Sequence, residues 1–144
     1  MRTRYFALIL GIAFLGAGIL GFVPALLSLP EGAPPLRLES GHGHLLGLFP
    51  VNVLHNLVHL IFGVWGIVVW RNFAASRVYA RSVAVIYGVL AVFGFIPGLN
   101  TLFGLVPLHG NDIWLHGLIA IASAYFGYAP VTNVESAGSA VRRP

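Results

Sequence analysis

Apolar residues along this chain fall into four long runs, and the short segments between the runs hold most of the polar and charged residues. Each run has all or nearly all of the roughly 17–25 residues that a helix needs to cross a bilayer. The predicted spans are Tyr5–Leu29, Leu48–Trp70, Val78–Pro97 and Asp112–Ala129. The pattern therefore predicts an all-α, polytopic membrane protein, with one four-helix transmembrane domain over residues 1–130 and a flexible tail over 131–144.

The composition supports this class of protein. Of the 144 residues, 58% are hydrophobic and 8% are charged, whereas a soluble domain carries about 25% charged residues. The mean hydropathy is +0.87, so too little polar surface is left to cover a soluble globule. The chain has no cysteine, which excludes disulfide bonds and thiolate metal sites.

The arginines predict the orientation of the spans. The net charge is +4, and seven of the basic residues lie before the first span, around the second connection or at the end of the chain: Arg2, Arg4, Arg71, Arg77, Arg81, Arg142 and Arg143. Only Arg37 lies in the first connection. Cytoplasmic segments carry the excess of basic residues, so both termini and the tail are predicted to be cytoplasmic. Because the arginines form no continuous patch, the expected partner is the lipid bilayer and not nucleic acid.

Short sequence repeats predict a duplicated helical hairpin. Gly21–Leu29 resembles Gly94–Leu102, and Gly47–Pro50 resembles Gly104–Pro107. The two copies would run in the same direction, which implies a pseudo-two-fold axis along the membrane normal. Such an axis would relate the second span to the fourth.

A polar stripe lies in the second span. Spacings of three and four residues place its members on one face of the predicted helix. Polar side chains at membrane depth are costly, so this face is expected to point into the bundle. Polar residues at the start of the fourth span would complete an intramembrane His/Asn network: Asn52, His55, Asn56, His59, Asp112 and His116.

Three of these residues are candidate metal ligands. His55 and His59 have the spacing of two zinc ligands on a helix, and His116 can supply a third. In metalloproteases with this spacing a glutamate follows the first histidine, whereas this chain has Asn56, so proteolysis is disfavoured. Haem would need ligands on opposite sides of the iron, which His55 or His59 could provide together with His116. The default expectation is no cofactor, with a metal or haem as the alternatives.

The segment Gly47–Leu60, followed by Asp112–His116, resembles a family of small bacterial membrane proteins catalogued as domain of unknown function 4383. Its Asn-x-x-His-Asn-x-x-His pattern is the most specific part of the resemblance. The resemblance implies a four-helix, multi-pass protein of the bacterial inner membrane, and it implies no activity.

Several functions are compatible with these residues. No nucleophile–base pair, phosphate-binding loop or carboxylate dyad is evident, so we expect no catalytic residues and no enzyme. The first hypothesis is a structural or accessory membrane component, acting as a homo-oligomer or within a larger complex. The alternatives are a metal-, haem- or pigment-binding redox protein and a small transporter or channel subunit.

Overall fold

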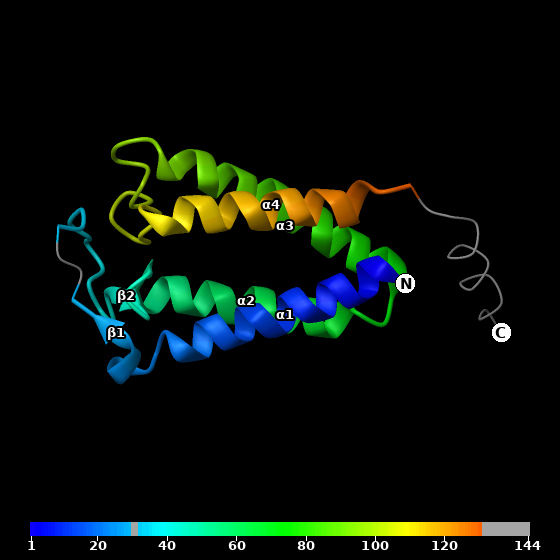
Figure 1. Ribbon diagram of the computed structural model, residues 1–144, viewed down its shortest axis with the longest axis horizontal. Helices are drawn as coiled ribbons and strands as arrows, with labels where there is room; N and C mark the ends of the chain where they lie inside the picture. The colour runs from blue at the N-terminus through cyan, green and yellow to red at the C-terminus, as the bar shows by residue number, and fades with distance from the viewer. Residues whose placement is uncertain (30–31, 131–144) are drawn as a thin grey trace.

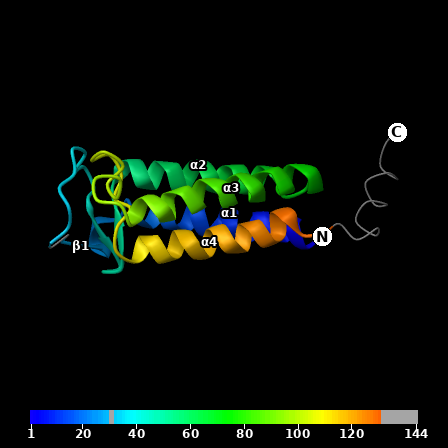
Figure 2. The ribbon, with the colours of Figure 1, turned by 90° about the horizontal axis from the view of Figure 1, so that it is seen from above.

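The computed structural model describes residues 1–29 and 32–130, so the tail predicted for 131–144 lies outside the described residues. The described residues form four helices that run side by side as an antiparallel bundle (Figures 1 and 2). The helices are α1 (Arg2–Leu20), α2 (Val53–Val69), α3 (Phe73–Gly94) and α4 (Asn111–Tyr128). The prediction of an all-α fold is therefore confirmed, with one small sheet added in the loops.

Two helical hairpins make up the bundle: α1 packs along α2, and α3 packs along α4. Glycines allow the backbones of α1 and α2 to approach closely. A Cβ atom added at Gly11 would lie 2.9 Å from the carbonyl oxygen of Gly63, and one added at Gly66 would lie 2.7 Å from that of Ala7. Close backbone contact at small residues is how helices pack when van der Waals attraction holds them together.

The first two helices are shorter than their predicted spans. Helix α1 ends at Leu20, not at Leu29, and a 3₁₀ turn, η1 (Pro24–Leu26), follows it. Pro24 lacks a backbone N–H and starts this new turn. Helix α2 begins at Val53, not at Leu48, because the preceding residues belong to a strand. The apolar runs therefore continue past the helices into the loops.

The loops cover one end of the bundle, here called the loop end. Strands β1 (Leu27–Ser28), β2 (Gly43–Leu45) and β3 (Phe49–Val51) form an antiparallel sheet in that order. The long first connection is joined to the third, because the backbone N–H groups of Arg37 and Leu38 both donate to the carbonyl oxygen of Gly104, at 2.8 and 3.2 Å. These contacts fix the two connections relative to each other.

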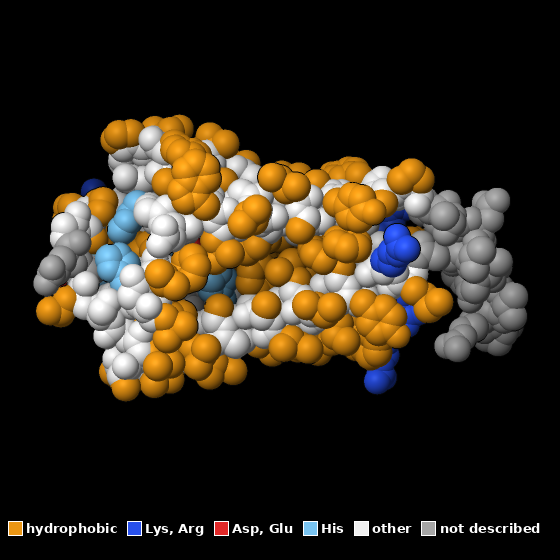
Figure 3. All heavy atoms as spheres, in the orientation of Figure 1, with side chains coloured by type: hydrophobic (Ala, Val, Ile, Leu, Met, Phe, Trp, Pro, Cys, Tyr) orange, Lys and Arg blue, Asp and Glu red, His pale blue; other side chains and the backbone are white. Residues whose placement is uncertain are grey.

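Arginines gather at the opposite end, here called the arginine end (Figure 3), and Figure 1 shows the N-terminus at the same end. Arg4 donates to the carbonyl oxygen of Trp70 at 3.0 Å, just after α2. Arg77 and Arg81 both donate to that of Gly127, at 3.1 and 2.9 Å, in the last turn of α4. Cations at helix C-termini satisfy free carbonyls and complement the helix dipole.

The core is narrow and the flanks of the bundle are apolar. Ala7, Phe14, Tyr79, Val83 and Tyr87 form the buried hydrophobic cluster between the hairpins. All four helices also expose large apolar side chains, including Ile9, Ile12, Leu57, Ile61, Val64, Val68, Val85, Val89, Leu118 and Ile121. Among the described residues, α1 and α3 are long and apolar enough to cross a membrane, and α2 is apolar but shorter.

Candidate metal centre

Asn52 begins the polar stripe, but it is not on the face of the helix. It is the N-cap of α2, and its Oδ1 accepts from the backbone N–H of His55 at 2.9 Å. Its Nδ2 donates to the carbonyl oxygens of Leu38 at 3.0 Å and Leu105 at 2.7 Å. The fully buried Asn52 thus ties the first and third connections to the start of α2. Asn52 therefore stands before the first helical residue of α2, with extended backbone, as N-cap residues do.

Asn56 is fully buried but points towards α1. A Cβ atom added at Gly21 would overlap the amide of Asn56, so the missing side chain of Gly21 makes room for it. Neither side-chain atom of Asn56 has a hydrogen-bond partner among the described residues. Asn56 therefore lies apart from the histidines, although the sequence pattern groups them.

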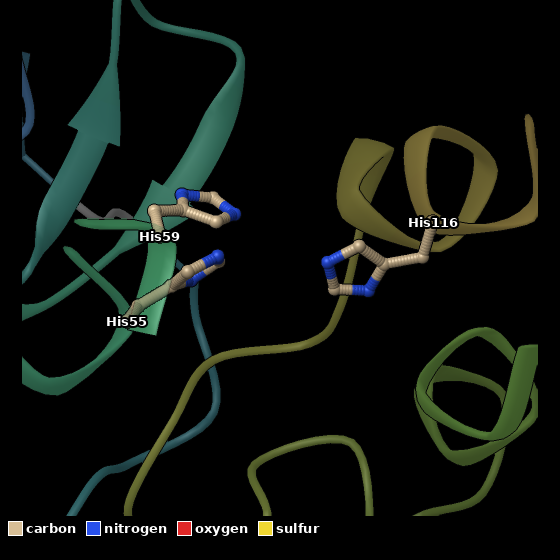
Figure 4. A group of neighbouring side chains, drawn as sticks. All are labelled: His55, His59 and His116. Carbon is tan, nitrogen blue, oxygen red and sulfur yellow. The ribbon is translucent and has the colours of Figure 1, made fainter. Parts of the chain in front are cut away.

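The three candidate histidines come together inside the bundle. His55 and His59 lie one turn apart on α2, with ring centroids 4.5 Å apart, and His116 faces them from α4 (Figure 4). The centroids of His55 and His116 are 6.2 Å apart. Each ring offers one nitrogen, and these three nitrogens all lie within 4.8 Å of one another. All three side chains are buried.

Asp112 adds a carboxylate to the three rings. It lies in the first turn of α4, one turn before His116, and is 1% exposed. Its Oδ2 lies 3.5 Å from Nε2 of His116 and 3.9 Å from Nε2 of His55. Asp112 and the three histidines are here called the buried centre. Its donors come from both hairpins, two from α2 and two from α4.

Aromatic rings from the other two helices enclose the buried centre. Phe14 of α1 stacks on His59, with centroids 5.4 Å apart and an interplanar angle of 16°. Tyr87 of α3 meets His116 edge-on, with centroids 4.9 Å apart. Phe14 and Tyr87 also stack on each other. All four helices therefore shape the site and hold the imidazole planes in place.

Some buried polar atoms of the centre lack hydrogen-bond partners. Nδ1 of His59, Nδ1 of His116 and Oδ2 of Asp112 are shielded from solvent and make no hydrogen bond to any described residue. Most buried polar atoms in proteins are hydrogen-bonded, so several orphaned atoms at one place need an explanation. Imidazole nitrogens and carboxylate oxygens are also the donors that bind transition metals.

One protein family matches the chain. The model of a family described as a domain of unknown function (DUF4383) matches residues 4–129. The chain belongs to this family. The match covers all four helices and every residue of the buried centre, so the resemblance carried by Gly47–Leu60 and Asp112–His116 extends over nearly the whole chain. Searches of curated proteins and of solved structures give no match.

The structure also identifies residues that the sequence pattern does not. Phe14 and Tyr87 contact the histidines, but an aromatic residue in an apolar helix gives no signal that distinguishes it from ordinary core. His42, His44 and His109 lie in the loops at the loop end, and only the fold shows that two different connections bring them together.

Proposed function

We propose that this protein is a four-span integral membrane protein that holds a divalent transition metal in the buried centre. The observation that carries the proposal is the convergence of His55, His59 and His116 beside Asp112, with the three ligand nitrogens within 4.8 Å of one another. A structural network would pair its buried nitrogens with donors or acceptors, as Asn52 does, whereas Nδ1 of His59 and of His116 have no partner in the described part of the chain.

The geometry needs only a small adjustment to close around an ion. At the outer limit of 4.8 Å, the common centre of three nitrogens lies about 2.8 Å from each. Zinc–nitrogen bonds are about 2.0–2.1 Å long, so each ring would move inwards by roughly 0.7 Å. Asp112 would then be a fourth ligand, or it would accept a hydrogen bond from a ligating imidazole and orient that ring.

The donor set indicates which ions fit. The chain has no cysteine, and its single methionine is Met1, so the soft sulfur ligands that favour Cu⁺ are missing from the centre. Imidazole with a carboxylate suits Zn²⁺ and Cu²⁺. Zn²⁺ is the simplest occupant because its filled d shell imposes no geometric preference, so the ion can accept the arrangement of the three histidines.

Haem fits this site less well. A haem between His55 and His116 would require the macrocycle to occupy the space around the line joining the two rings. Oδ2 of Asp112 lies within 3.9 Å of Nε2 of both residues, and the His59 ring lies 4.5 Å from the His55 ring. These side chains already fill the place that the macrocycle would need.

The exposed apolar flanks and the two chemically different ends support four spans. Helices α2 and α4 have 17 and 18 residues, or roughly 25–27 Å, close to the ~30 Å hydrocarbon core. They pack antiparallel to α1 and α3, the two helices that meet the length and hydropathy of a span. With the arginine end in the cytoplasm, both termini are cytoplasmic and the loop end is external. The proposed location is the bacterial inner membrane.

Metal analysis of the full chain, purified in mild detergent and titrated with Zn²⁺ or Cu²⁺, tests the proposal. We expect about one tightly bound ion per chain, because three imidazoles and a carboxylate complete one site. His59→Gln and His116→Gln should lose it, while Ser123→Ala, which changes another buried polar group of α4, should keep it. If the wild-type protein binds no ion, the centre is a structural network.

Reporter fusions test the topology separately. Fusions at the N-terminus and at Pro144 should report the cytoplasm, and an insertion at Gly32 in the first connection should report the external side. A cytoplasmic first connection would reject the orientation, whatever the metal analysis shows.

A further inference from the structure

Three histidines outside the buried centre meet at the loop end. His42 and His44 lie in the first connection, with His44 in β2, and His109 lies in the third connection just before α4. The two connections are joined by the hydrogen bonds to Gly104, and Nδ2 of Asn111 donates to the carbonyl oxygen of Leu48 at 3.2 Å. The histidines are therefore held near one another by the fold.

Their geometry suits transient binding of an ion. The ring centroids of His44 and His109 are 6.4 Å apart, wider than the roughly 5 Å of two imidazoles on one tetrahedral ion, as suits a loosely held ion. Nε2 of His42 and Nε2 of His109 have no hydrogen-bond partner among the described residues.

The loop histidines adjoin the buried centre. His109 precedes Asp112 by three residues, so their Cα atoms lie within about 11 Å of each other. Oδ2 of Asp112 in turn lies within 3.9 Å of Nε2 of His55 and of His116. His109 therefore lies in the segment that leads directly into Asp112 and the buried centre.

We propose that His42, His44 and His109 capture a divalent metal ion at the external face and pass it, by way of Asp112, to the buried centre. The inference rests on the proposed function, since it names the route by which the same site is filled. Capture is favoured over a second permanent site because, among the described residues, only His55, His59 and His116 bring three ligand atoms within 4.8 Å. An ion held nearby has a high effective concentration at the centre, which speeds loading without changing the final affinity.

Stopped-flow loading of the full-length protein in detergent, with Co²⁺ as a coloured substitute for Zn²⁺, tests the inference. The variant combines His42→Gln, His44→Gln and His109→Gln, and the matched control is the exposed loop substitution Ser40→Ala. We expect the triple variant to load and release Co²⁺ about tenfold more slowly than wild type at low metal concentration. Its final stoichiometry and Kd should be unchanged, because both rates fall together, and Ser40→Ala should behave as wild type.

Other results would overturn the inference in distinguishable ways. Equal loading rates would show that the loop histidines take no part. Loss of one of two bound ions in the triple variant would show a second permanent site in place of a capture site. His59→Gln should bind no ion tightly although its loop histidines are intact, and stable binding there would also contradict capture. If wild type binds no Co²⁺ or Zn²⁺, the proposed function fails first, whereas normal binding with equal rates rejects only the loading route.

Discussion

The N-cap of α2 and the buried centre one turn later both contain buried polar side chains, but these side chains differ in their hydrogen bonding. Asn52 pairs both of its donors and its acceptor oxygen with backbone groups of three segments. His59 and His116 are also buried, yet each keeps a ring nitrogen that has no partner among the described residues. Burial alone therefore does not separate structural polar residues from ligands. The convergence of several donor atoms does, because the Asn56 amide is also buried and unpaired among the described residues, whereas the three imidazoles bring their ligand nitrogens within 4.8 Å of one another.

The largest expected effect follows from removing a ligand. His116→Ala deletes the only imidazole that the second hairpin contributes to the centre. We expect affinity for Zn²⁺ to fall by about 1,000-fold or more, equivalent to roughly 4 kcal/mol, since two imidazoles on one helix make a weak site. Competition titration with a chromophoric chelator measures the change. Unchanged affinity would remove His116 from the ligand set and break the distinction drawn above.

A second expected effect concerns stability without metal binding. Asn52→Ala leaves the N–H of His55 and the carbonyls of Leu38 and Leu105 without their partner. At about 1 kcal/mol for each bond, the free energy of unfolding should fall by roughly 3 kcal/mol. Reversible unfolding in mixed micelles measures it. Asn52→Asp should lose at least as much, because its carboxylate keeps the acceptor for the helix N-terminus but faces the carbonyl oxygens of Leu38 and Leu105 without a donor. Zn²⁺ stoichiometry should stay the same in both variants, and its loss would make Asn52 part of the centre.

Asp112→Asn keeps the shape of the side chain and removes its charge. We expect affinity for Zn²⁺ to fall by about 10–100-fold, the usual consequence of changing a group that orients ligands. Isothermal titration of the detergent-solubilised protein would measure it. A loss as large as that of His116→Ala would make Asp112 a direct ligand, and no loss would leave it as a helix-terminal residue only.

The smallest expected effect concerns Asn56 and α1. Gly21→Ala places a methyl group against the Asn56 amide, which should lower the free energy of unfolding by about 1–3 kcal/mol. Asn56→Ala alone should change it by less than about 1 kcal/mol, because its amide has no partner to lose. The double variant should recover most of the loss caused by Gly21→Ala. Additive effects would place the strain of Gly21→Ala elsewhere.

Much of this architecture is readable from the sequence. The apolar runs predict four helices in the right order, and the spacing of His55 and His59 places both rings on one face of α2. The boundaries are less accurate, because apolar residues such as Leu27 and Phe49 belong to strands of the loop sheet. Hydrophobicity indicates burial, and it does not distinguish a helix end from a buried loop.

The finer arrangement of the site depends on tertiary contacts. Helical spacing groups Asn56 with the histidines, yet the absence of a side chain at Gly21 lets Asn56 turn towards α1. The roles of Phe14 and Tyr87 follow from packing between helices far apart in the sequence. The meeting of His44 with His109 depends on the pairing of two loops. None of these contacts leaves a periodic signal in the chain.

The division of the donors between the hairpins has a consequence for assembly. The first hairpin carries His55 and His59, and the second carries Asp112 and His116. An ion bound by both sets would act as a reversible crosslink between two halves that otherwise meet through a narrow apolar core. Since a ligand that binds only the assembled state stabilises it according to its concentration, the tightness of the whole bundle would follow the supply of metal outside the cell.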